Sequence, residues 1–249
     1  MSGHSKWSQI KRKKGIKDQA RGQLFSKLAR LITIAVIEGG RTTDPDHNIK
    51  LRMAIEKARQ ENMPKDNINR AIEKGTGPNS QLLQESIYEG FGPGGVALLI
   101  QVTTDNSNRT HSEIRNILDK YGGKIGGQGS VNYLFQKCGT IAFAKNQIKE
   151  EDVFSFADKI SAFDIDEDDG SFTVYFPFVA LGKVKGFLGD LKGSAPELDY
   201  RPTTTLKIED HNKAQKILNL VEALEEQDDV HKVFSNFNIK DKFLIVLDK

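Results

Sequence analysis

The spacing of apolar residues changes near residue 80, and this change most limits how the chain can fold. Before that point, apolar residues recur at helical spacing in three segments, which begin near Leu24, at Asp44-Pro45 and after Pro64. After it, apolar residues alternate as in strands, and these segments take turns with helical ones. The sequence therefore predicts a basic arm over residues 1 to about 20 and a small all-helical domain, which together make residues 1–78, followed by an α+β region.

The α+β region contains one complete unit between two half units. Residues 137–202 show the order strand, helix, strand, strand, helix, strand, which is the βαββαβ pattern of ferredoxin-like folds. The half before it has a strand at 96–102, a helix that Thr110 and Glu113 would open as a capping box, and a strand at 130–135. The half after it has strands at 204–208 and 230–236 with a helix between them. We therefore expect an α+β multidomain protein with two ferredoxin-like domains, of which 137–202 is inserted into a discontinuous domain of residues 79–136 plus 203–249.

Composition excludes several protein classes. The chain has 249 residues, of which 37% are hydrophobic and 28% charged, as is typical of globular proteins. Its longest apolar run, residues 31–37, is too short to cross a bilayer, and the N-terminus lacks a secretory signal pattern. The single cysteine, Cys138, cannot form an intrachain disulfide, which suits a reducing compartment. We expect a cytoplasmic protein with no membrane partner.

The net charge of +2 hides a strong asymmetry along the chain. Residues 1–78 contain 17 lysines and arginines against 8 aspartates and glutamates, whereas the remainder contains 19 against 26. Clustered cations gain affinity for nucleic acid by displacing the counterions condensed on phosphates. The residues expected to bind nucleic acid are Lys6, Trp7, Lys11, Arg12, Lys13, Lys14, Lys17, Arg21, Lys27 and Arg30.

Trp7, the only tryptophan, lies between Lys6 and the run of cations at 11–14. An aromatic ring among cations can stack on an unpaired base while its neighbours hold the backbone. The alternative is that Trp7 packs on the helical domain and the lysines only face water. No helix-turn-helix or zinc-finger signature occurs in this arm, although helices of the first domain could still enter a groove. The candidates for such a basic helical face are Lys27, Arg30, Arg52 and Arg59.

Two glycine-rich segments and one polar loop are further candidate sites. Residues 88–97 and 121–130 have neither dinucleotide-binding nor P-loop spacing, so tight turns are the better interpretation. Residues 104–110 join a strand end to a helix start, where anions often bind, but ordinary turn and capping chemistry explains them equally well. The loop residues that could contact a second partner are Gly92, Gly94, Asp105, Asn108 and Arg109.

No residue pattern in the sequence indicates catalysis or metal binding. The acidic run at 164–170 fails the EF-hand test, because Asp169 stands where glycine is needed and Tyr175 where glutamate is needed. The five histidines are scattered, and no nucleophile-elbow, zinc-protease or cysteine signature occurs. We expect no metal, no cofactor and no enzymatic activity. The remaining alternatives are an enzyme that acts on a nucleotide or RNA through an unmarked carboxylate pair, and a pure interaction scaffold.

Several motifs occur in an order and spacing that resemble the YebC/PmpR family, whose mitochondrial relative is the translational activator of cytochrome c oxidase. They are GHSKW at 3–7, YEGFGPGGVA at 88–97, TDNSNRT at 104–110, GSVNYLF at 129–135, PTTT at 202–205 and LEEQDDVHKVFSN at 224–236. Small departures, such as KRKK at 11–14 in place of the more usual KHRK, keep the charge. The resemblance implies three domains, a helical one followed by two α+β ones.

The same resemblance implies a non-enzymatic, nucleic-acid-binding regulator of gene expression. The family's usual description is a DNA-binding transcriptional regulator, and the alternative is a ribosome-associated translation factor that relieves stalling on proline-rich nascent chains. Phosphate attraction serves DNA and ribosomal RNA equally. Trp7 among cations suits structured RNA, whereas the lack of a known groove-reading motif weakens sequence-specific DNA recognition. No feature of the sequence indicates an oligomeric state.

Overall fold

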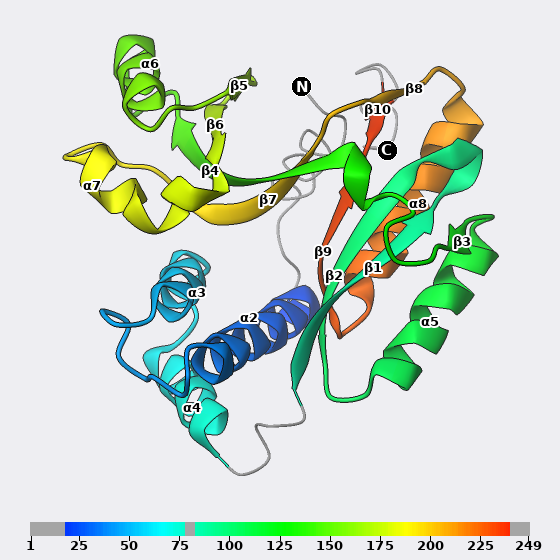
Figure 1. Ribbon diagram of the computed structural model, residues 1–249, viewed down its shortest axis with the longest axis horizontal. Coiled ribbons are helices and arrows are strands. Elements are labelled where there is room, and N and C mark those ends of the chain that lie inside the picture. The colour runs from blue at the N-terminus through cyan, green and yellow to red at the C-terminus, as the bar shows by residue number, and fades with distance from the viewer. Residues whose placement is uncertain (1–17, 78–82, 240–249) are drawn as a thin grey trace.

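The computed structural model describes residues 18–77 and 83–239, which form a helical unit and two sheet-containing units (Figure 1). The helical unit consists of α2 (Asp18–Glu38), α3 (Ile49–Gln60) and α4 (Lys65–Thr76), with α3 and α4 both packed on α2. Its core is apolar and comes from all three helices. The buried residues are Leu28, Ile32, Ala35, Val36, Leu51, Ile55, Ala58, Met63, Ile68 and Ala71.

The second helix begins later than its sequence predicted. Asp44 and Pro45 lie in a turn, and α3 starts at Ile49. Asn48 is the N-cap, because its side-chain oxygen accepts a hydrogen bond from the Leu51 N–H at 3.1 Å. The side-chain amide of Asn48 also donates to the Ala35 carbonyl at 2.8 Å, which ties the start of α3 to α2.

The inserted unit has the strand order of a ferredoxin-like fold. Its elements are β4 (Phe135–Ala144), α6 (Glu150–Lys159), β5 (Asp164–Glu167), β6 (Ser171–Pro177), the 3-10 helix η4 (Phe178–Lys183), α7 (Val184–Leu188) and β7 (Glu197–Pro202). The sheet runs β5-β6-β4-β7, and every neighbouring pair is antiparallel. Phe143, Phe156 and Phe176 are fully buried in its core.

The second sheet-containing unit uses chain from both sides of the inserted one. Its elements are β1 (Gln84–Phe91), the 3-10 helix η2 (Pro93–Gly95), β2 (Ala97–Thr104), α5 (Ser107–Lys120) and β3 (Lys124–Ile125), then β8 (Leu206–Ile208), α8 (His211–Glu226), β9 (Val230–Ser235) and β10 (Phe237–Ile239). The main sheet runs β3-β1-β2-β9, whereas β8 and β10 form a separate parallel pair. Helices α5 and α8 cover one face of the main sheet (Figure 1).

The structure confirms the predicted fold class, a helical region followed by mixed sheet-and-helix units. The discontinuous unit differs from the prediction, because β8 pairs with β10 outside the main sheet and because β3 and β10 were not predicted. Strand β1 was not predicted, because Glu85, Glu89 and Gly90 interrupt its apolar pattern, yet it pairs with β2 along its whole length. The strand predicted at 130–135 is wrong, because residues 132–134 form the short 3-10 helix η3 (Asn132–Leu134) and only Phe135 enters β4.

A buried carboxylate, that of Glu89, explains why residues 132–134 do not form the predicted strand. The Glu89 side chain accepts hydrogen bonds from the backbone N–H groups of Gly129 at 2.6 Å, Val131 at 2.7 Å and Asn132 at 2.9 Å. Burial of Glu89 opposes its ionisation, but these backbone donors hold its pKa below the ordinary value. Donors bound to one carboxylate are not available to a neighbouring strand, so this segment wraps around Glu89 instead of extending.

The other face of the main sheet is only partly covered. Leu99 and Phe234 pack against Phe135 and Tyr200 of the inserted unit, and the rings of Tyr200 and Phe234 lie 5.0 Å apart. Helix α2 approaches the same sheet at the end of β2 (Figure 1). No helix within the described residues is long and apolar enough to span a membrane.

The close packing of α4 on α2 predicts opposite effects of alanine at two helical glycines. A Cβ at Gly75 would lie 2.6 Å from Cβ of Val36, whereas one at Gly22 meets nothing within 4 Å. We expect Gly75→Ala to lower the free energy of unfolding by about 1–3 kcal/mol through overpacking. Gly22→Ala should raise it by about 0.5–1 kcal/mol, because alanine favours helix. Urea unfolding measures both, and a Gly75→Ala protein as stable as the parent would contradict the packing argument.

Candidate nucleic-acid interface

The residues predicted to bind nucleic acid divide between the N-terminal arm and helix α2. Arg21, Lys27 and Arg30 lie on α2, and Arg21 is exposed near its start. The remaining predicted contacts lie outside the described residues; they are Lys6, Trp7, Lys11, Arg12, Lys13, Lys14 and Lys17.

Lys27 and Arg30 lie one helical turn apart and reach the junction between α8 and β9. The Lys27 ammonium donates to the carbonyl of Glu225. The Arg30 guanidinium donates to the carbonyl of Asp228 at 2.8 Å and to the Asp229 carboxylate at 2.6 Å. The structure therefore places these two predicted contact residues at an internal junction between the helical unit and the main sheet.

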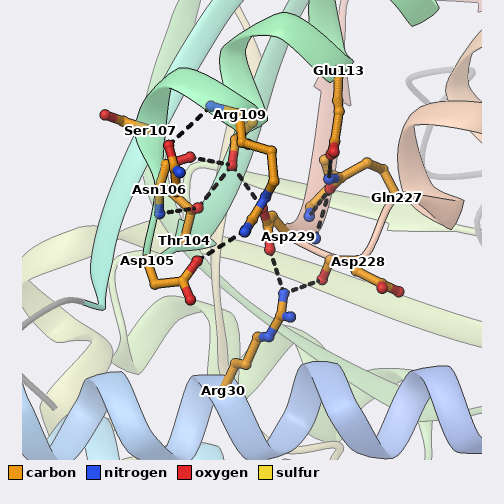
Figure 2. Close-up of polar contacts among 12 residues, drawn as sticks. Arg30, Thr104, Asp105, Asn106, Ser107, Arg109, Glu113, Gln227, Asp228 and Asp229 are labelled. Atoms are coloured by element: carbon orange, nitrogen blue, oxygen red, sulfur yellow. Dashed lines mark hydrogen bonds and ion pairs between the residues drawn. The ribbon is translucent and has the colours of Figure 1, made fainter. Parts of the chain in front are cut away.

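Asp229 is the centre of this junction (Figure 2). Its side chain is 3% exposed, and both of its oxygens are used. One oxygen accepts from Arg30, and the other accepts from Arg109 at 2.9 Å and from the Thr110 hydroxyl at 2.6 Å. The three donors come from α2 and from the first turn of α5, so one carboxylate joins the helical unit to two parts of the main sheet unit.

The electrostatics of this cluster favour an ionised Asp229. Burial alone would raise its pKa, but hydrogen bonds from Thr110 and Arg109 and the charges of Arg30 and Arg109 hold the pKa below its ordinary value of 3.8. Asp229 is therefore a buried anion with paired cations at neutral pH.

The polar loop at 104–110 caps the start of helix α5. Asn106 is the N-cap of α5, because its side chain accepts from the Arg109 N–H at 3.1 Å. The predicted capping box at Thr110 and Glu113 is wrong, since α5 already begins at Ser107. Thr110 is instead buried in the first turns of the helix, where its hydroxyl contacts Asp229 and lies 2.8 Å from the hydroxyl of Thr104.

The loop residues predicted to contact a second partner are not gathered at one place. Asp105 and Asn108 are exposed at the start of α5, and Arg109 donates to both Asp105 and Asp229. Gly92 and Gly94 lie at the opposite end of β2, in the turn that connects it to β1. Eight strand residues, about 25 Å, separate the two loops. The sequence did not indicate this separation.

Other cations of the helical unit face outward. Arg59 lies in the last turn of α3, and Lys65, Arg70 and Lys74 follow on α4. All four side chains are exposed, and none forms an ion pair within the described part of the chain. Arg70 and Lys74 are four residues apart and so share one face of α4. Of the basic helical face predicted from sequence, Arg59 is the exposed member.

Sequence reasoning assigned no role to Asp229 or to His231, although both lie in the motif at 224–236. Adjacent acids in a turn between a helix and a strand were the available signal for Asp229. His231 has both ring nitrogens buried, and neither makes a hydrogen bond within the described chain. Burial, followed by the charges of Lys27, Lys57 and Arg30, lowers its pKa to about 3. His231 is therefore neutral at physiological pH.

The described residues contain no cluster of metal ligands and no activated thiol. They contain no group of three or more histidine, cysteine, aspartate or glutamate side chains placed to hold a metal ion. Cys138 is buried, and burial followed by the nearby charge of Asp199 raises its pKa to about 12. A thiol with that pKa remains protonated at neutral pH and is a poor nucleophile.

Comparison with known proteins assigns the family. The model of the TACO1/YebC protein N-terminal domain matches residues 5–78, and the model of the TACO1/YebC second and third domains matches residues 83–237. The chain belongs to the TACO1/YebC family. This confirms the resemblance to YebC/PmpR proteins found in the sequence.

Members of the TACO1/YebC family are similar to this chain over almost its whole length. A protein of Syntrophus aciditrophicus is 44% identical over 248 residues, which are 98% of each chain, and is named a probable transcriptional regulatory protein. One of Chloroflexus aurantiacus with the same name is 46% identical over 244 residues, 96% of each chain. The crystal structure of a conserved hypothetical protein from Aquifex aeolicus matches with a TM-score of 0.84 at 40% identity, covering 90% of this chain and 93% of that one. The family names identify a regulatory type of protein.

The Asp229 cluster predicts a large stability loss when its charge is removed. Asp229→Asn leaves Arg30 and Arg109 without their shared anion. Because these guanidinium groups are 33% and 45% exposed, we expect the loss of their charge-assisted hydrogen bonds to cost about 1.5–3 kcal/mol. Asp105→Asn is the matched control, because Asp105 also pairs with Arg109 but its side chain is 59% exposed. We expect the control to lose less than about 1 kcal/mol in urea unfolding. Equal losses in the two variants would argue against Asp229 as the centre of the junction.

The stability loss caused by Asp229→Asn has a defined dependence on pH. Because the folded pKa of Asp229 lies below its ordinary value of 3.8, its stabilising contribution is complete above that value and is lost as pH falls through the folded pKa. The stability gap between the parent and Asp229→Asn should therefore narrow below about pH 4 and stay constant between about pH 5 and 7.

Proposed function

We propose that this TACO1/YebC protein is a cytoplasmic, non-enzymatic regulator of gene expression that binds DNA through its basic N-terminal region. The observation that carries the proposal is the charge separation, with 17 basic against 8 acidic residues in 1–78 and 19 against 26 elsewhere. Such a cluster attracts the phosphate backbone, while the acidic remainder repels it. The names of the bacterial relatives, probable transcriptional regulatory proteins, support the same function.

Within this proposal, the cations of the helical unit have two different roles. Lys27 and Arg30 hold α2 against the α8–β9 junction, and thereby fix the orientation of α3 and α4. Arg70 and Lys74 face outward on α4 and contact phosphates together with the arm. Helices α3 and α4 are joined by only four residues, 61–64, and helices connected by such short turns serve in proteins that place a helix in the major groove.

The salt dependence of DNA binding tests this proposal. If about six cations contact duplex phosphates, the plot of log affinity against log salt concentration should have a slope near −5. Replacing Lys11, Arg12, Lys13 and Lys14 by alanine should weaken binding and reduce the magnitude of the slope by about 3–4. Fluorescence anisotropy with a labelled duplex gives both values. A slope near zero for the parent protein would overturn the proposal.

A matched control uses four exposed lysines of the acidic region. Lys149, Lys159, Lys207 and Lys216 are exposed and form no ion pair within the described residues. Their replacement by alanine changes the net charge by the same amount as the arm variant. We expect their slope to equal that of the parent, and an equal loss in both variants would mean that only total charge matters.

The ribosome-associated alternative rests on Trp7 among the cations of the arm, since an aromatic ring among cations can stack on unpaired bases of structured RNA. Ultraviolet crosslinking in living cells, with sequencing of the attached DNA and RNA, distinguishes the two targets. A transcriptional regulator should enrich a few promoters above a ribosomal background. Enrichment of discrete ribosomal RNA segments would replace the transcriptional proposal by the translational one, and Trp7→Ala should then reduce that enrichment while Trp7→Phe retains it.

A further inference from the structure

A large cleft lies where the helical unit, the main sheet and the inserted unit meet. Its volume is about 1320 Å³, and its walls come from α2 and α3, from β1, β2 and β9, and from η4 and β7. Figure 1 shows how α2, α3, β7 and the main sheet are arranged where these walls meet. Pockets for small molecules are typically about 300–1,000 Å³, so this cleft is large enough for a segment of polypeptide.

The floor of the cleft is a row of residues across the main sheet. Ile87 pairs in register with Gln101, and Gln101 pairs with Lys232 on the next strand, so the three side chains lie on one face. All three line the cleft. Part of this face is packed under the inserted unit and α2 approaches it at the end of β2, but at this row nothing within the described residues covers it.

The cleft collects exposed apolar side chains from separate parts of the chain. Ile49 on α3 is 48% exposed, Ile87 on β1 is 40%, and Phe178 and Val179 on η4 are 40% and 84%. These are four of the eight large apolar side chains that are exposed in the described residues. Exposed apolar groups that gather in one place usually mark a site of protein interaction, whereas scattered ones do not.

The charges of the cleft leave an excess of unpaired cations. Its carboxylates already have partners: Lys50 pairs with Glu38 and Glu85, the backbone N–H groups bind Glu89, and Lys57 and Lys232 pair with Glu197. By contrast, the lysines beside the most exposed apolar wall have no carboxylate partner among the described residues. They are Lys137 and Lys183, and the Lys137 ammonium lies 4.1 Å from the centroid of the Phe178 ring.

We infer that the cleft binds an extended peptide segment of a partner protein, one that carries apolar side chains next to carboxylates. Aliphatic walls at Ile49, Ile87 and Val179 bury the apolar side chains, and Lys137 and Lys183 pair with the carboxylates. Nucleic acid fits the cleft less well, because its bases would find mainly aliphatic surface. The inference does not depend on DNA binding.

Selection from a random peptide library identifies the ligand class. Peptides of about ten residues displayed on phage are selected on the full-length protein, and the enriched sequences are synthesised with a fluorescent label for anisotropy measurements. We expect enrichment of leucine, isoleucine or phenylalanine together with aspartate or glutamate. No enrichment over a Val179→Asp protein, or enrichment of basic sequences, would overturn the inference.

Variants of exposed residues locate the binding site without threatening the fold. Val179→Asp places a charge on the apolar wall and should weaken binding of the selected peptides about tenfold or more. Phe154→Asp is the matched control, because Phe154 is also an exposed apolar residue, at 49%, but lies outside the cleft. Equal affinities for the parent and Val179→Asp would mean that the peptides bind elsewhere.

Charge reversal tests the acidic part of the ligand. Lys137→Glu with Lys183→Glu should weaken binding of the selected peptides, and Lys149→Glu with Lys159→Glu should leave it unchanged. DNA binding by Val179→Asp provides the last comparison. Unchanged DNA affinity supports two separate sites, whereas a matching loss, with displacement of the peptide by a single-stranded oligonucleotide, would make the cleft part of the nucleic-acid site and overturn the peptide inference.

Discussion

The arrangement of the units depends on one buried carboxylate, that of Asp229. A charge removed from water must be compensated by partners, and here the partners are Arg30, Arg109 and Thr110. Arg30 positions α2, while Arg109 and Thr110 fix the start of α5 against the end of α8. If any of these groups moved away, Asp229 would remain buried and underpaired, so the contacts stabilise one relative position of the helical unit and the sheet.

A second buried carboxylate, that of Glu89, organises a loop beside the same sheet. Glu89 on β1 binds the backbone N–H groups of Gly129, Val131 and Asn132, which shapes the loop that borders the cleft. In both cases a buried acid of the sheet unit holds a neighbouring segment in place. Each acid provides the acceptor for donors that apolar packing alone would leave without partners: backbone N–H groups at Glu89, and side-chain cations at Asp229.

Local patterns in the sequence predicted the elements whose stability is local. Helical spacing located α2 and α4, and the period of the inserted unit predicted its βαββαβ order. Strand β1 was not predicted, because its pairing with β2 determines its structure more than its own composition does. The ion pair at the junction could not be predicted, because Arg30 and Asp229 are separated by 199 positions and no local property of either residue indicates the other. Arg109 was noticed, but its loop suited capping and ligand binding equally until Asp229 was placed beside it.

The helical unit takes part in both proposed binding surfaces, and the Asp229 junction determines how they affect each other. Helix α3 forms one wall of the cleft through Ile49, α4 carries the outward cations Arg70 and Lys74, and both helices pack on α2. Two ligands influence each other only if each binds two conformations of the protein with different affinity. Because Arg30 and Lys27 hold α2 in one position, a peptide in the cleft and nucleic acid at the basic surface meet the same conformation. Their binding free energies are then additive while the junction is intact, and coupling between them requires that it open.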